Sequence, residues 1–192
     1  IGENAFYDCR KLTSIVIPNS VSLIGDKAFY RCFDLASVTL GNSVTSIGEH
    51  AFYYCQGLKS VTIPDAVITI ADGAFYECEN IEHVTFGNSV TTIGNSVFLN
   101  CISLKNIVIP NSVITIGRDA FFNCNSMTSV AIGNAVTSIG SSAFSGCNSL
   151  MSMVIPNSVT EMGNSVFNGC SNLRSVSISN SLTSIPSNCF EN

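Results

Sequence analysis

The sequence predicts an α/β repeat solenoid: a right-handed coil with a parallel β-sheet on one face and short strands plus α or 3₁₀ helical turns on the other. Three observations predict this fold. A motif returns every 23 residues, one of its columns is phenylalanine in every copy, and each copy contains a stretch that alternates apolar and small polar residues. A ladder of identical side chains at fixed spacing is typical of identical coils stacked on one another.

The period holds without a gap from one end of the chain to the other. When the chain is written in rows of 23 residues, the first position is isoleucine in every row except the one that begins with Met162. The phenylalanine column has no substitution and comprises Phe6, Phe29, Phe52, Phe75, Phe98, Phe121, Phe144, Phe167 and Phe190. We therefore expect residues 1–192 to form one solenoid of eight coils plus a partial ninth, as a fragment of a longer array.

The residues after the cysteine of each coil predict a strand. The pattern L-x-x-V-x-I, as in Leu12, Ile15 and Ile17, alternates with serine and threonine, which indicates a strand with one buried face. Pro-Asn-Ser or Gly-Asn-Ser then predicts a turn, because proline lacks the ladder N–H and asparagine bonds to nearby backbone. Proline and glycine alternate at this position, beginning with Pro18 and Gly41, so the true repeat is a pair of coils.

The rest of each coil predicts a short extended piece and a helical turn. The apolar piece, residues 21–24 in the first copy, leads into G-x-x-A-F-x-x-C. Its cysteine follows the phenylalanine by three residues and the alanine by four, which favours about one turn of α or 3₁₀ helix held by inward packing.

The motif L-x-x-V-x-I-P-N-S-V-T-x-I-G-x-x-A-F-x-x-C at a period of 23 resembles the BspA-like (Treponema pallidum type) leucine-rich repeat over the whole chain. Departures are small: Ala71 and Pro186 replace the glycine, and Val97, Val166 and Cys189 replace the alanine. The resemblance implies a secreted or cell-surface protein that adheres to host or microbial surfaces. It implies no catalytic residues.

Composition excludes several partners. Charged residues make up 11% of the chain and the net charge is −5, so the chain has no basic stripe for nucleic acid. No apolar run approaches the ~20 residues of a membrane span, so no membrane insertion is expected. Residues 1–96 carry all of the net charge, with ten acids and five bases, whereas residues 97–192 carry three of each. A charged partner is therefore expected on the N-terminal half.

The cysteines and histidines do not predict a catalytic or metal site, and no cofactor is expected. Eight cysteines share one column, where in-register stacking holds them about 4.8 Å apart and suits neither a disulfide nor tetrahedral zinc. They are expected to be buried and free, with Cys189 as the reactive thiol. His50 and His83 lie in different columns without a recurring acid or nucleophile, so the chain is not expected to be an enzyme.

Two variable surface columns provide candidate binding residues. The tentative ligand site follows the phenylalanine and comprises Tyr7, Tyr30, Tyr53, Tyr54 and Tyr76, together with the carboxylates Glu3, Asp26, Glu49 and Asp72. A tyrosine ladder flanked by carboxylates is suited to stacking on sugars or to anchoring a protein, because tyrosine offers a large contact area at little entropy cost. Alternatively, the rings only shield the edge of the core.

The other candidate is the outward face of the predicted sheet. Its distinctive residues are Lys59, Glu82, His83, Lys105 and Arg174. Solenoids often bind through their sheet face.

The function predicted from these features is adhesion by binding of proteins or glycans, without catalysis. The alternative is a passive spacer that holds another domain away from the cell surface. Uncapped coils at both ends predict weak end-to-end self-association.

Overall fold

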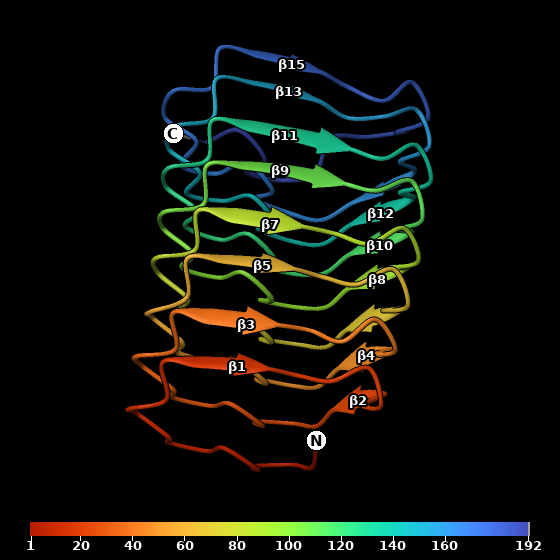
Figure 1. The fold of residues 1–192 in the computed structure, drawn as a ribbon. Helices are drawn as coiled ribbons and strands as arrows, with labels where there is room; N and C mark the ends of the chain where they lie inside the picture. Colours follow the sequence, from red (N-terminus) through yellow and green to blue (C-terminus); the bar gives the residue numbers. More distant parts are fainter. Residues whose placement is uncertain (192) are drawn as a thin grey trace.

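The alternating stretch after each cysteine forms the main sheet. The structure, a computed structural model, describes residues 1–191. The main-sheet strands, one per coil, are β1 (Ser14–Val16), β3 (Ser37–Thr39), β5 (Ser60–Thr62), β7 (His83–Thr85), β9 (Asn106–Ile109), β11 (Ser129–Ile132), β13 (Ser152–Val154) and β15 (Ser175–Ser177). Paired strands are parallel with a register shift of 23 residues, as in Ser14 opposite Ser37. Figure 1 shows them stacked along one face.

The short apolar piece of each coil forms a second parallel sheet. Its two-residue strands are β2 (Leu23–Ile24), β4 (Ser46–Ile47), β6 (Thr69–Ile70), β8 (Thr92–Ile93), β10 (Thr115–Ile116), β12 (Ser138–Ile139) and β14 (Glu161–Met162). Each strand pairs with those of the adjacent coils, as Ile24 does with Ile47, in one seven-stranded sheet. The two sheets lie on different sides of the stack, with the chain ends at opposite poles (Figure 1).

The predicted helical turns are wrong, because the G-x-x-A-F-x-x-C segment forms a chain of turns. The amides of Ala5 and Tyr7 bond to carbonyls three residues back at 3.3 and 3.0 Å, whereas those of Asn4 and Phe6 bond to the next coil at 3.0 and 2.7 Å. Asn4 and Asp8 have φ angles of 56° and 59°, and both columns keep positive φ in other coils. Bonding between coils by every second amide excludes the regular i→i−4 bonding of a helix.

No helix is present in residues 1–191, and accordingly none that could cross a membrane.

The phenylalanine ladder fills the centre of the coil. The seven rings from Phe29 to Phe167 are fully buried. Successive rings from Phe6 to Phe190 stack with centroids 4.9–5.7 Å apart and interplanar angles of at most 11°. Their burial, with that of the isoleucine and leucine columns, supplies the main stabilisation of the fold.

The cysteine column lies beside this ladder, and all nine cysteines of the chain are free. Seven of the thiols also donate to the carbonyl of the phenylalanine in the preceding coil, as Cys78 does to Phe52 at 3.1 Å. The expectation for Cys189 is wrong: it is 2% exposed, whereas Cys9 is exposed. Cys189 takes the buried alanine position of its coil.

The main sheet is divided at every second junction. We call coils with Pro18, Pro64, Pro110 or Pro156 proline coils, and the coils after them glycine coils, although Ser179 replaces glycine in the last. Each proline coil pairs fully with the glycine coil that follows, giving β1–β3, β5–β7, β9–β11 and β13–β15. Pairing is much weaker from a glycine coil to the next proline coil. There β7 and β9 have one paired position, His83 with Asn106. Among the described residues, β3 does not pair with β5, and β11 does not pair with β13. We call the fully paired junctions closed and the others open.

Candidate functional site

The tyrosines of the first candidate site form a continuous stack. The register of 23 residues places Tyr7, Tyr30, Tyr53 and Tyr76 in adjacent coils, with ring centroids 4.9, 4.7 and 4.8 Å apart along the series. Tyr54 meets Tyr53 edge-on at 4.7 Å. Because the rings face one another, the stack presents mainly ring edges and hydroxyls to solvent.

The tyrosine side chains are partly accessible. Tyr7 is 45% exposed, and the other four are half-buried. Burial, followed by the neighbouring Tyr30, raises the pKa of Tyr53 to about 12. Burial and the nearby Glu77 also raise the pKa of Tyr54 and of Tyr76. Tyr53, Tyr54 and Tyr76 therefore offer neutral hydroxyl groups that can donate hydrogen bonds.

The four carboxylates predicted beside the stack make contacts within or between coils. Asp26 accepts the backbone N–H of Glu49 at 2.7 Å, and Asp72 accepts that of Asn95 at 2.7 Å. Glu3 accepts a hydrogen bond from the Asn4 side chain at 3.1 Å. Two of the four thus support the coil-to-coil backbone, and within residues 1–191 no side-chain hydrogen bond links any of the four to a tyrosine.

Glu49 also faces a histidine. Its Oε1 lies 3.2 Å from Nδ1 of His50, close enough for an ion pair when the imidazole is protonated. The two atoms do not form a hydrogen bond, and Nδ1 of His50 is buried without a hydrogen-bond partner in residues 1–191.

Glu77 is the acidic neighbour of the tyrosines that sequence reasoning missed. It contributes to the raised pKa of Tyr53, Tyr54 and Tyr76, and its Oε1 accepts a hydrogen bond from Asn100 Nδ2 at 3.1 Å. The repeat pattern could have identified it, since Glu77 directly follows Tyr76 and lies 23 residues after Tyr54, in the same column of the repeat.

The second candidate site is brought together only in part. Lys105 Nζ donates to Glu82 Oε2, and this hydrogen bond lowers the pKa of Glu82, with smaller contributions from His83 and Lys59. These four residues belong to three successive coils, whereas Arg174 lies three coils beyond Lys105 and is separate from them.

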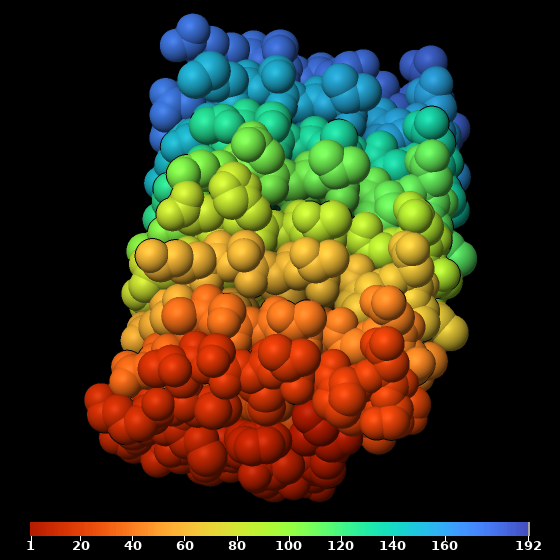
Figure 2. Space-filling model, viewed as in Figure 1, coloured from red at the N-terminus to blue at the C-terminus, as the bar shows by residue number. Residues whose placement is uncertain are grey.

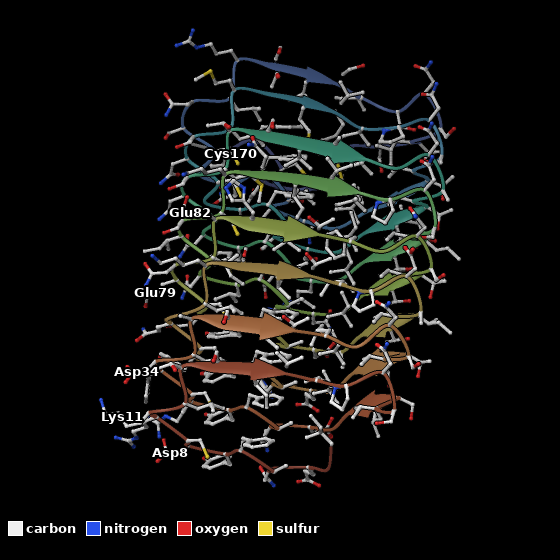
Figure 3. The ribbon with its side chains drawn as sticks, in the orientation of Figure 1. Asp8, Lys11, Asp34, Glu79, Glu82 and Cys170 are labelled. Carbon is white, nitrogen blue, oxygen red and sulfur yellow. The ribbon has the colours of Figure 1, made fainter. Side chains whose placement is uncertain are left out.

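Charged residues of the N-terminal half gather along one edge of the stack. Figure 3 shows this edge with Asp8, Lys11, Asp34, Glu79 and Glu82. Lys11 pairs with Asp34 at 3.0 Å, and Gln56 donates to Glu79 at 3.0 Å, each across one coil. Exposed pairs of this kind contribute roughly 0–1 kcal/mol each, so the edge is a solvated rim with little effect on stability.

No cluster of three or more metal-ligating side chains is found in the part of the chain that the structure describes. The two histidines lie in different columns, one in the turn segment and one at the start of β7. The accessible chemistry is therefore that of phenol hydroxyls, carboxylates and a flat sheet face.

Comparison with known proteins agrees with this architecture. Residues 1–127 and 91–192 match the BspA type leucine rich repeat region, which is described as having six copies. No curated protein matches the chain.

Solved structures show the same fold. A leucine-rich repeat protein from Bacteroides ovatus is 34% identical, with a TM-score of 0.76, over 97% of this chain and 54% of that protein. The T. pallidum leucine rich repeat protein is 33% identical, with a TM-score of 0.79, over 85% of this chain and 79% of that one. A leucine rich cell surface protein from Faecalibacterium prausnitzii is 30% identical, with a TM-score of 0.60, over 100% of this chain and 60% of that one.

This chain thus spans about half the length of the Bacteroides ovatus protein. The repeat match covers every coil, and the solved relatives share the parallel solenoid and its leucine-rich repeats. The chain belongs to the BspA-type leucine-rich repeat family.

Proposed function

We propose that this chain is the binding region of a cell-surface or secreted adhesin, which attaches to host or microbial surface proteins or glycans without catalysing a reaction. The observation that carries the proposal is the tyrosine stack, where four aligned phenols lie in the half of the chain that bears the whole net charge. The surface location is supported by the relative from Faecalibacterium prausnitzii, which is described as a cell surface protein.

The geometry of the stack favours hydrogen bonding over stacking on sugars. The faces of the inner rings are covered by one another at 4.7–4.9 Å, so a sugar ring has access to few aromatic faces. The hydroxyls donate to carbonyl, carboxylate or sugar oxygens. The surrounding carboxylates add a long-range attraction for a basic surface, which speeds association and is weakened by salt. A basic protein surface is the partner that fits best.

The test is binding of the purified chain to a panel of immobilised host matrix proteins and glycans. A variant with Tyr7, Tyr30, Tyr53 and Tyr76 replaced by Ser is expected to lose binding. A variant with the same four residues replaced by Phe keeps the stacked rings, and its loss of binding would assign recognition to the hydroxyls. Raising the salt concentration is expected to weaken binding of the unmodified chain.

The matched control lies in the same column of the neutral half, where Leu99→Ser and Phe122→Ser together are expected to leave binding unchanged. Circular dichroism checks that every variant is folded. If the folded chain binds nothing on the panel, the passive-spacer alternative is favoured. If the Ser and control variants lose binding equally, the site does not lie on the tyrosine stack.

A further inference from the structure

One column of the repeat has a left-handed backbone and nevertheless carries large side chains in three successive coils. Its φ angle is 61° at Arg31, 59° at Tyr54 and 56° at Glu77. The amide of each of the three donates to a carbonyl of the next coil at 2.8–2.9 Å, so their side chains leave the stack in the same direction. We call these residues the Arg31–Tyr54–Glu77 column. They belong to the orange to yellow part of the space-filling view (Figure 2).

The fold does not require large side chains at this position. The next four coils have Asn100, Asn123, Gly146 and Gly169 there, with φ angles of 59°, 57°, 73° and 72°. Glycine adopts this conformation without steric cost and asparagine adopts it more readily than other residues, whereas long side chains rarely do. Strained backbone of this kind is typical of functional positions. The three large side chains therefore indicate a role other than folding.

Arg31 and Glu77 carry opposite charges that are too far apart to pair with each other. Opposite charges in one column do pair when they are one coil apart, as Lys11 and Asp34 do at 3.0 Å. Tyr54 occupies the coil between Arg31 and Glu77, so two coils, or about 10 Å, separate their backbones. Neither charge has an ion pair with any other side chain of residues 1–191.

Aromatic neighbours hold Arg31 in place without neutralising it. Its guanidinium carbon lies 5.9 Å from the ring centroid of Phe33, and that ring meets Tyr54 edge-on at 6.3 Å. Asp8 precedes Arg31 in the column, but it is already paired with Arg10 at 2.9 Å. The hydrogen bond from Arg10 is the main cause of the lowered pKa of Asp8, to which Arg31 contributes least. Arg31 is exposed and offers a positioned cation.

The Glu77 end of the column lies in the acidic part of the chain. Residues 47–92 contain six acids and one base, whereas residues 1–46 contain four of each. Glu77 is half-buried, and its Oε1 accepts a hydrogen bond from Asn100 Nδ2 at 3.1 Å. Because this donor is neutral, the bond orients the carboxylate and leaves its charge uncompensated.

We propose that the Arg31–Tyr54–Glu77 column binds a protein segment that carries an acidic and a basic side chain about 10 Å apart. The acidic group of the segment pairs with Arg31, its basic group pairs with Glu77, and Tyr54 contacts the segment between them. Arginine and tyrosine often dominate the binding energy of interfaces, and side chains that are already held in place lose little entropy on binding. The inference rests on the proposed adhesin function and adds the charge pattern that the partner carries.

The probes are three labelled, alanine-based helical peptides that differ only at two positions seven residues apart, about 10.5 Å along a helix. These positions hold Glu and Arg, Arg and Arg, or Glu and Glu. Binding to the whole chain is measured by fluorescence anisotropy in about 0.15 M salt, which screens attraction beyond about 8 Å. The Glu/Arg peptide is expected to bind about fivefold more tightly than either of the other two.

Charge reversal should change which peptide is preferred. Arg31→Glu should make the Arg/Arg peptide the tightest of the three, and Glu77→Arg should do the same for the Glu/Glu peptide. Arg174→Glu is the matched control, because it changes the net charge as Arg31→Glu does but lies outside the column, and it should leave the preference unchanged.

A second readout separates binding from folding. Arg31→Asn and Glu77→Asn should each abolish the preference for the Glu/Arg peptide while Tm stays unchanged or rises, because asparagine adopts the left-handed conformation more readily. A fall in Tm in both variants would mean that the column serves the fold.

The synthetic peptides also keep this test apart from that of the adhesin proposal. The chain with its four stacked tyrosines replaced by Phe retains the column and should keep the peptide preference even if it no longer binds the immobilised panel. An unchanged preference in both charge reversals, an equal change in Arg174→Glu, or no binding of any peptide at millimolar concentration would overturn the inference.

Discussion

Each buried phenylalanine contacts two copies of itself, and this explains why the column tolerates no other residue. A ring such as Phe98 lies between Phe75 and Phe121 at 5.4 Å on both sides, fully buried. A smaller side chain would leave a void that both neighbours line. Conservation of the column within the chain is therefore a packing requirement, and sequence reasoning identified it because repetition made it visible.

Phe98→Ala is expected to lower the free energy of unfolding by about 3–5 kcal/mol, the range for deletion of a buried aromatic ring. Urea denaturation followed by circular dichroism measures the change. Phe6→Ala provides the control, since Phe6 is only partly buried and has one neighbour in the stack, Phe29. Equal losses in the two variants would contradict the packing explanation.

The buried thiols should make the fold sensitive to alkali. Burial raises the pKa of six thiols above the ordinary 9.0: Cys55, Cys78, Cys101, Cys124, Cys147 and Cys170. For Cys170 the pKa rises to about 11. Above pH 9 the unfolded chain loses these protons while the folded chain keeps them. The stabilisation is therefore complete below pH 9 and decreases as the pH rises toward the folded pKa values.

Each such thiol is expected to remove about 1.4 kcal/mol of stability per pH unit above pH 9. Urea midpoints measured between pH 8 and pH 10.5 under reducing conditions test this expectation. A midpoint that does not change over this interval would mean that the thiols titrate normally in the folded chain.

Among the elements, the strands were predictable from the sequence and the turn segment was not. The alternation around Ile15 and Ile17 indicates a buried face directly, and β1 begins at Ser14. The spacing of Cys9 from Phe6 and Ala5, three and four residues, fits a helical turn equally well in an isolated segment. The neighbouring coil decides between a helical turn and a chain of turns. The amides of Asn4, Phe6 and Asp8 bond to the next coil, and the backbone has positive φ at Asn4 and Asp8.

The proline–glycine junction offers a test of how the turns pack. Gly87→Ala is expected to destabilise the chain by about 1–3 kcal/mol, as overpacking does, because the new methyl group would meet backbone of Pro64 and Asp65. Gly2→Ala is the control, since an added Cβ there meets nothing within 4 Å. Thermal melts of both variants measure the effect. A neutral Gly87→Ala would show that the closed junction has room to spare.

Over the whole molecule, the sequence predicted the solenoid, its period and its pairing of coils. Which junctions between coils have fully paired strands was seen only in the structure. Alternation of Pro64 and Gly87 is plain in the sequence, but it does not say which junction opens. The candidate tyrosines were identified because their column changes along the chain, from tyrosine in the first four coils to other residues afterwards. Glu77 was missed because its role depends on which side chains become neighbours in adjacent coils. Surface columns thus specify possible contacts, and packing selects among them.

The most direct test of the two-coil organisation is amide hydrogen exchange of the free chain, resolved by residue with NMR. Ile63 donates to Thr85 at 2.8 Å across a closed junction, whereas Phe86 in the next coil has no such bond in residues 1–191. The Phe86 amide is expected to exchange at least about tenfold faster than that of Ile63, and Leu40 likewise faster than Ile17. Equal protection within each pair would show that all junctions are closed and would contradict the two-coil account.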